Sequence, residues 1–216
     1  MTFTLSERIM NRNDQTLQSF VSRLASKAPV PGGGGAAALM GALAAALCEM
    51  AGNLTVGKPK YARHEADQRR MIAACESLRE RFLRLIEADA EAFAPLSEAY
   101  SMPKDAPDYQ QTMTRVTLCA ARPPRQMLAC CCETVALLEE MLEKCSRLMI
   151  SDVGCGAAAA EAAMKAAYLN VLINTRSLPE NAEANALEAE CAAMLQTWLP
   201  RARAVSDAVA ERLGRN

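Results

Sequence analysis

An aspartate interrupts the apolar pattern of a long predicted helix. Over residues 65–94 the apolar positions alternate in spacings of four and three, which is typical of a helix that packs along a partner helix. Asp89 stands where this pattern predicts a large apolar side chain. Burial disfavours a charged carboxylate, so the pKa of Asp89 should rise until the group can exchange a proton near neutral pH. The alternative is a structural aspartate that pairs with a buried arginine or asparagine and fixes the helix register.

A run of glycines provides a second candidate site. Gly32, Gly33 and Gly34, followed by a fourth glycine, precede an uncharged stretch that should form a central helix. Glycines at a helix start let a ligand approach the backbone N–H groups, which favour a carboxylate, a phosphate or a polar ring. The run is not a P-loop, because no Gly-Lys-Ser/Thr follows, and no strand precedes it as in a dinucleotide loop. A flexible turn is the alternative.

A basic segment follows the central helix. Lys58 and Lys60 are separated by a proline, and Tyr61 and Arg63 come next. Two lysines beside an aromatic ring suit an anionic aromatic ligand. The alternative is a basic turn that faces solvent.

Three polar residues near the end of the chain are further candidates. Asp152, together with Ser151, is expected to cap a helix. Asn170 and Asn174 lie one helical turn apart in an otherwise apolar segment. Buried amides need hydrogen-bond partners, which either the protein or a ligand could supply.

The histidine and cysteine content argues against two other chemistries. His64 is the only histidine, and it lies in a charged run, so a Ser-His-Asp or Cys-His arrangement is not expected. There is no Cys-x2-Cys pair, and the three consecutive cysteines at residues 130–132 would point in different directions around a helix. We therefore expect no metal site, and we expect the nine cysteines to be free thiols in a reducing cytoplasm.

Helices must position all of these residues. Aromatic residues make up 4% of the 216 residues, whereas strong helix formers abound. We expect an all-α fold, a single-domain bundle of about six to eight helices over residues 1–216. The first helix should begin at a cap formed by Asn13 or Asp14 and end near Ala28. Prolines should end or kink later helices at Pro95, at residues 123–124 and at Pro200.

Charge and hydropathy limit the partners of the chain. The formal net charge is −1, which gives no reason to expect binding to nucleic acid or to an anionic membrane. The polar N-terminus lacks the apolar core of a signal peptide, so a cytoplasmic location is expected. Residues 36–48 could be read as a membrane span, but they are mostly alanine and glycine and end at Glu49, so no membrane partner is expected.

In combination, these segments resemble the folate-processing family of formiminotetrahydrofolate cyclodeaminases and methenyltetrahydrofolate cyclohydrolases. The resemblance rests on residues 29–34, 38–43, 53–58, 60–61, 89–93, 151–152 and 167–174. It implies an all-helical homodimer that binds a tetrahydrofolate derivative near the subunit interface, with no other cofactor. Gly35, Ala36 and Pro59 depart from the residues common in the family.

The resemblance also implies residue roles. Asp89 matches the family's catalytic aspartate, and Lys58 lies in the basic segment near the ligand. Together with the residues above, the matched segments predict this substrate-binding set: Gly32, Gly33, Gly34, Asn53, Lys60, Tyr61, Arg63, Asp152, Asn170 and Asn174. In this hypothesis Asp89 shuttles a proton at the carbon between N5 and N10, and Lys58 orients the reacting group. A non-catalytic helical folate-binding or assembly protein is the alternative.

Overall fold

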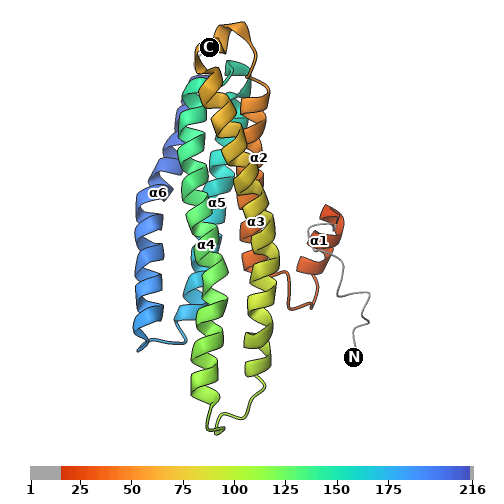
Figure 1. Cartoon of the computed structure of the whole chain (residues 1–216), viewed down its shortest axis with the longest axis vertical. Coiled ribbons are helices and arrows are strands. Elements are labelled where there is room, and N and C mark those ends of the chain that lie inside the picture. Colours follow the sequence, from red (N-terminus) through yellow and green to blue (C-terminus); the bar gives the residue numbers. More distant parts are fainter. Residues whose placement is uncertain (1–15, 215–216) are drawn as a thin grey trace.

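The computed structural model describes residues 16–214, and this part of the chain contains six α-helices and two short 3₁₀ helices but no strand (Figure 1). The elements are α1 (Leu17–Leu24), α2 (Gly33–Asn53), η3 (Pro59–His64), α3 (Glu65–Ala99), α4 (Tyr109–Lys144), η4 (Arg147–Met149), α5 (Ile150–Thr175) and α6 (Ala182–Gly214). The predicted all-α fold is therefore confirmed for the described residues.

Five long helices form an elongated bundle. Helices α2 to α6 run alternately up and down its long axis, while α1 stands beside the bundle near the start of α2 (Figure 1). Helix α2 packs against α3 and α5, and α6 covers α4 and α5. Phe20 is the buried residue of α1. The bundle therefore has two ends, and each end brings together the termini of several helices.

Small residues let α2 lie close to its neighbours. Its alanines are mostly buried, and a Cβ atom added at Gly41 would lie 2.3 Å from the ring of Phe82 in α3. A Cβ atom added at Gly156 of α5 would lie 2.9 Å from Leu138. Packing at such short separations leaves no room for larger side chains. Glycine and alanine in α2 are thus a packing requirement of the central helix.

Helix α2 contains the residues that could be read from the sequence as a membrane span. Within residues 16–214 it is the one helix whose length and composition would allow it to cross a membrane, and it lies near the N-terminus. More than half of its most apolar stretch is buried inside the bundle. The core helix of a soluble protein passes the same test, so the absence of a membrane partner stays a prediction.

The prediction that prolines end the helices was wrong, whereas the alternative that they kink them stays a prediction. Helix α3 continues through Pro95, α4 through Pro123 and Pro124, and α6 through Pro200. Each proline removes one backbone hydrogen bond, but every one of these helices is more than 30 residues long and is held along its length by the bundle. Tertiary packing therefore outweighs the local preference of proline to end a helix.

Two predicted helix caps also need correction. The described cap of α1 is Thr16, whose Oγ1 accepts a hydrogen bond from the Ser19 N–H at 3.1 Å, and α1 ends at Leu24. Asn13 and Asp14 lie outside the described residues. Helix α5 begins at Ile150 without a side-chain cap, so Asp152 lies within its first turn. There its charge still complements the positive end of the helix dipole.

Candidate active site

A cavity of about 200 Å³ lies where the start of α2 meets α3, α4 and the end of α5. Its lining residues are Pro29, Val30, Gly32, Gly33, Gly34, Asp89, Phe93, Leu96, Tyr100, Ala120, Asn170, Ile173 and Asn174. The glycine run, Asp89 and the two asparagines were predicted from separate segments. The structure brings them together around this one cavity. Their roles remain predictions.

The carboxylate of Asp89 lies against the first turn of α2. The Gly35 N–H donates a hydrogen bond to it. The N-cap residue of α2 is Gly32, which has no side chain to cap the helix, so Asp89 satisfies one of the free N–H groups from a neighbouring helix. A Cβ atom added at Gly34 would lie 2.3 Å from Asp89 Oδ1. Glycine is therefore required for this approach of carboxylate to backbone.

Burial raises the pKa of Asp89 to about 6, and the hydrogen bond from Gly35 opposes this rise. Desolvation is the larger effect, because the side chain is enclosed by packed helices while a single N–H compensates its charge. A carboxyl with this pKa is present in both protonation states near neutral pH. It can therefore act first as an acid and then as a base in one reaction cycle.

Asn170 and Asn174 of α5 form the wall of the cavity across the glycine run from Asp89. The Nδ2 of Asn170 donates to the carbonyl of Ala166 at 2.8 Å. The Nδ2 of Asn174 donates to the carbonyl of Asn170 at 2.8 Å and to that of Ala120 at 3.3 Å. A Cβ atom added at Gly33 would lie 3.0 Å from Asn170 Nδ2. The glycine run therefore lies between the asparagine wall and the aspartate.

The basic segment lies at the other end of the bundle. Helix α2 has 21 residues, and at roughly 1.5 Å per residue it separates the Asp89 cavity from Lys58 by about 30 Å. Gly57, with a φ of 80°, turns the chain after α2. The Nζ of Lys60 lies 5.9 Å from the centre of the Tyr61 ring. Within one chain Lys58 therefore does not lie beside Asp89, and its predicted role stays a prediction.

Asn53 and Asp152 lie at this same distant end. Asn53 is the last residue of α2 and is exposed. Just beyond it, Thr55 Oγ1 accepts a hydrogen bond from the Ser146 N–H at 2.8 Å, which ties the end of α2 to the segment that precedes α5. Asp152 lies in the first turn of α5. Like Lys58, these two residues are not brought to the Asp89 cavity of their own chain.

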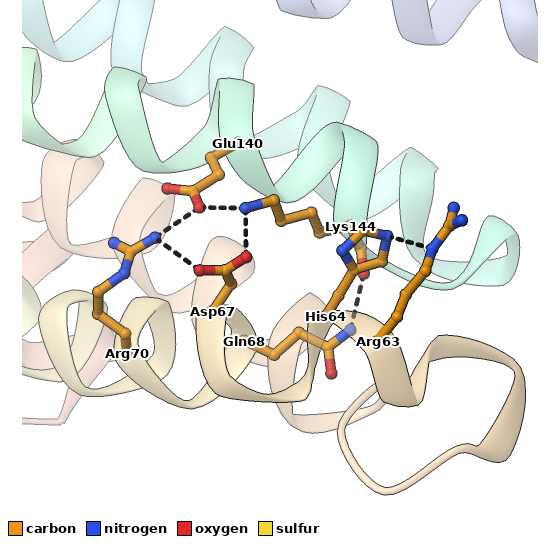
Figure 2. A network of polar contacts seen from close by, with 7 residues as sticks. All are labelled: Arg63, His64, Asp67, Gln68, Arg70, Glu140 and Lys144. Carbon is orange, nitrogen blue, oxygen red and sulfur yellow. Dashed lines mark hydrogen bonds and ion pairs between the residues drawn. The ribbon is translucent and has the colours of Figure 1, made fainter.

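Ion pairs join α3 to α4 beside the basic segment (Figure 2). Lys144 Nζ lies 2.5 Å from Asp67 Oδ2 and 2.7 Å from Glu140 Oε1. Arg63 Nε donates to His64 Nε2 at 2.9 Å. Arg63, which was predicted to bind substrate, is thus exposed at the edge of this network. Among residues 16–214 no group of histidine, cysteine, aspartate and glutamate has an arrangement that could hold a metal ion.

Aromatic and apolar residues of the cavity were not predicted. The apolar pattern assigns Phe93 and Leu96 only to packing, and Tyr100 lies beyond the proline that was expected to end the helix. The spacing from Asp89 through these three residues is again four, three and four. Following the pattern past Pro95 would have placed all of them on the face of Asp89.

The fold and the cavity together define a class of protein: an all-helical bundle that holds a partly buried carboxyl against a glycine-rich helix start. Residues 16–193 match the family described as formiminotransferase-cyclodeaminase. The chain belongs to this family, which confirms the resemblance found in its residues.

Relatives agree with this assignment, and a solved structure shares the fold. Methenyltetrahydrofolate cyclohydrolase from Methylorubrum extorquens is 37% identical over 173 residues, which cover 78% of this chain and 83% of that protein. Formimidoyltransferase-cyclodeaminase from Mus musculus is 33% identical over 176 residues, which cover 78% of this chain but 32% of that longer protein. A formiminotetrahydrofolate cyclodeaminase from Thermotoga maritima has the same fold, with a TM-score of 0.80, 24% identity, and coverage of 91% and 98% of the two chains.

Proposed function

We propose that this protein is a folate one-carbon enzyme that acts on the carbon between N5 and N10 of tetrahydrofolate. It is either a cyclodeaminase, which releases ammonia and forms the 5,10-methenyl compound, or a cyclohydrolase, which opens that compound with water. The family and its named relatives support this function. The single observation that carries it is the half-buried Asp89, whose pKa of about 6 suits proton transfer near neutral pH.

Both reactions can use Asp89 in the same way. In the cyclodeaminase, N10 attacks the formimino carbon, its proton passes to ionised Asp89, and the acid returns a proton to the departing ammonia. In the cyclohydrolase, water attacks the methenyl carbon, and Asp89 moves the proton from this water to the nitrogen whose bond to carbon breaks. An ionised carboxylate also stabilises the cationic amidinium form of either substrate. The proposed chemistry requires no cofactor beyond tetrahydrofolate itself.

Incubating the pure protein with each folate and following the absorbance of the methenyl compound tests this function. Appearance of the compound from 5-formiminotetrahydrofolate identifies a cyclodeaminase, and loss of pre-formed compound identifies a cyclohydrolase. The Asp89→Asn protein is the control for uncatalysed conversion. Folate binding without turnover in either assay would instead indicate a non-catalytic binding protein.

We further propose that the protein works as a homodimer, in which each site uses both chains. The cavity is smaller than the pockets of roughly 300–1,000 Å³ that enclose most small ligands, so much of a folate must extend beyond it. Helix α2 exposes Leu43 and Met50, and Leu54 is exposed directly after its end. On the neighbouring α5, Leu169 and Ile173 are exposed. This apolar face suits a second copy related by a two-fold axis. An antiparallel partner would bring its basic segment to the Asp89 cavity.

Mixing two inactive variants tests the shared site. Asp89→Asn and Lys58→Ala should each be inactive and dimeric, because each removes one residue from every site. Refolded together at equal concentrations, they should regain about a quarter of the wild-type activity, since half of the dimers are mixed and each mixed dimer holds one intact site. Activity and sedimentation are the measurements. Mixed dimers without any regained activity would contradict a site built from two chains.

Replacing Gly34 should impair the site through Asp89. In Gly34→Ala the added Cβ would lie 2.3 Å from Oδ1, so the carboxylate must leave the helix start. Because a displacement of about 1 Å can cost ~10²-fold in rate, we expect kcat to fall at least ~10-fold. Gly32→Ala is the matched comparison, because no atom lies within 4 Å of its added Cβ. Equal kcat values for the two variants would argue against the close contact.

We also propose a cytoplasmic location. The nine cysteines are free, and seven of them are buried within the bundle, which suits a reducing compartment.

A further inference from the structure

The amide of Asn174 has a defined orientation. Its Nδ2 carries two hydrogens, and it donates to the carbonyls of Asn170 and Ala120 at 2.8 Å and 3.3 Å. If the amide were reversed, its oxygen would face two carbonyl oxygens, so this alternative is unfavourable. Among residues 16–214 no hydrogen bond is made to Asn174 Oδ1. Asn174 lines the cavity and is partly exposed there, so its free acceptor is available to a ligand.

A proline in α4 makes the carbonyl of Ala120 available. In an uninterrupted helix this carbonyl would accept the N–H of residue 124, but residue 124 is a proline and has no N–H. The Asn174 side chain, from the neighbouring α5, donates to it instead. Pro123 frees the carbonyl of Cys119 in the same way, but no described side chain donates to that carbonyl. Two adjacent prolines thus differ in one respect: Pro124 alone provides an acceptor for Asn174.

The cavity therefore presents acceptors along one wall. The Nδ2 of Asn170 donates to the Ala166 carbonyl, and no described residue donates to its Oδ1. With Asn174 Oδ1 and the carboxylate of Asp89, three acceptors lie around a cavity of about 200 Å³. Neutral amide oxygens and a carboxylate favour a ligand that offers N–H groups.

We propose that Asn174 is a specificity-determining residue whose Oδ1 accepts an N–H of the nitrogen heterocycle of tetrahydrofolate, and that Pro124 is a positioning residue that orients Asn174 through the Ala120 carbonyl. This inference rests on the proposed function and deepens it. It assigns the pterin, with its N–H groups, to the Asp89 cavity, and it leaves the glutamate tail to surfaces outside.

Replacing the two prolines separately tests the positioning role. In Pro124→Ala a new backbone N–H competes for the Ala120 carbonyl and releases the Asn174 amide. The KM, and the Kd for 5-formyltetrahydrofolate as a stable probe, should rise about 2- to 10-fold, the range for losing one neutral hydrogen bond. The kcat should stay within about twofold and its pH profile should not move, since Asp89 is untouched. Pro123→Ala, which makes the same change one residue away, should leave KM and Kd unchanged.

Asn174→Ala completes a double-mutant cycle. It should raise the Kd on its own, and adding Pro124→Ala should then have no further effect, because the two residues act through one hydrogen bond. Equal Kd values for Pro124→Ala and Pro123→Ala would overturn the positioning role. So would a Pro124→Ala substitution that raises the Kd as much in the Asn174→Ala protein as in the wild type. If Pro124→Ala does not fold, Asn174→Ala decides alone: an unchanged Kd overturns the inference, and a raised Kd with normal kcat supports it.

The Kd measurement separates this inference from the proposed enzyme function. If the wild-type protein binds the probe but converts neither substrate, the proposed function fails, while the proline and asparagine variants still test the recognition. If the wild-type protein does not bind the probe at all, the inference is overturned, because it assigns the pterin to this cavity.

Discussion

The Asp89→Asn protein is expected to fold and to bind tetrahydrofolate, yet to turn it over at least ~10²-fold more slowly, the usual range for a general acid–base residue. The amide oxygen of the new asparagine can still accept the Gly35 N–H, so the start of α2 keeps its partner. The amide cannot take up or release a proton at neutral pH. The substitution therefore removes the proton transfer and preserves the shape of the cavity.

Steady-state kinetics with both folates, together with the Kd for 5-formyltetrahydrofolate, would check this expectation. Glu91→Gln is the matched control, because it neutralises an exposed carboxyl on the same helix and should leave kcat near the wild-type value. The wild-type kcat should also depend on a group that titrates near pH 6, and the Glu91 variant should keep this dependence. Near-normal turnover in Asp89→Asn would remove Asp89 from the mechanism.

The same substitution should make the folded protein more stable at neutral pH. An aspartate has a pKa of about 3.9 when unfolded, whereas burial raises the pKa of Asp89 to about 6 when folded. The folded protein thus binds more protons between these values, and its free energy of unfolding falls as the pH rises from about 4 to above 6. The loss amounts to about 3 kcal/mol at pH 7 to 8, because each pKa unit corresponds to ~1.4 kcal/mol. Asparagine carries no charge and avoids this loss.

Urea unfolding of both proteins at pH 4, 6 and 8 would measure the difference. Asp89→Asn should be the more stable protein by up to about 3 kcal/mol at pH 8, and the difference should vanish toward pH 4, where Asp89 is largely protonated in the folded protein. Protein concentration must be equal in the two series, since dimer formation also contributes to stability. A difference that does not change with pH would contradict the raised pKa of Asp89.

The pattern of apolar residues carried most of the information about the site. An aspartate at an apolar position of a helical pattern predicted a buried carboxyl. Asp89 lines the cavity, and burial raises its pKa as this position implies. The glycine run and the pair Asn170 and Asn174 also proved to be neighbours. Such predictions succeed because the spacing of residues along a helix determines on which face of the helix their side chains lie.

The prolines show where local rules fail. Pro95, Pro123 and Pro124 were expected to end or kink helices, but each lies inside a helix that continues past it in the bundle. This error concealed Tyr100, which continues the face of Asp89 beyond Pro95. It also concealed the free carbonyl of Ala120, because a backbone acceptor appears only when a proline lies within a continuous helix.

The distance between the candidate groups could not be predicted from residue types alone. Lys58 and Asp89 were assigned to one site because both belong to segments that resemble the family. The length of α2 places them at opposite ends of a single chain. In the proposed homodimer their association depends on a second chain, and the sequence of one chain does not show how two copies are arranged.

The length of the uninterrupted helix α2 fixes both the distance and the rotation between the two ends of the molecule. Each residue added to an α-helix rotates the C-terminal remainder of that helix by about 100° and advances it by roughly 1.5 Å. A single insertion in the middle of α2 would thus turn the basic segment away from the face on which Gly34 meets Asp89. Insertions of one residue should abolish function when they fall within α2 and be tolerated in the loop between α3 and α4.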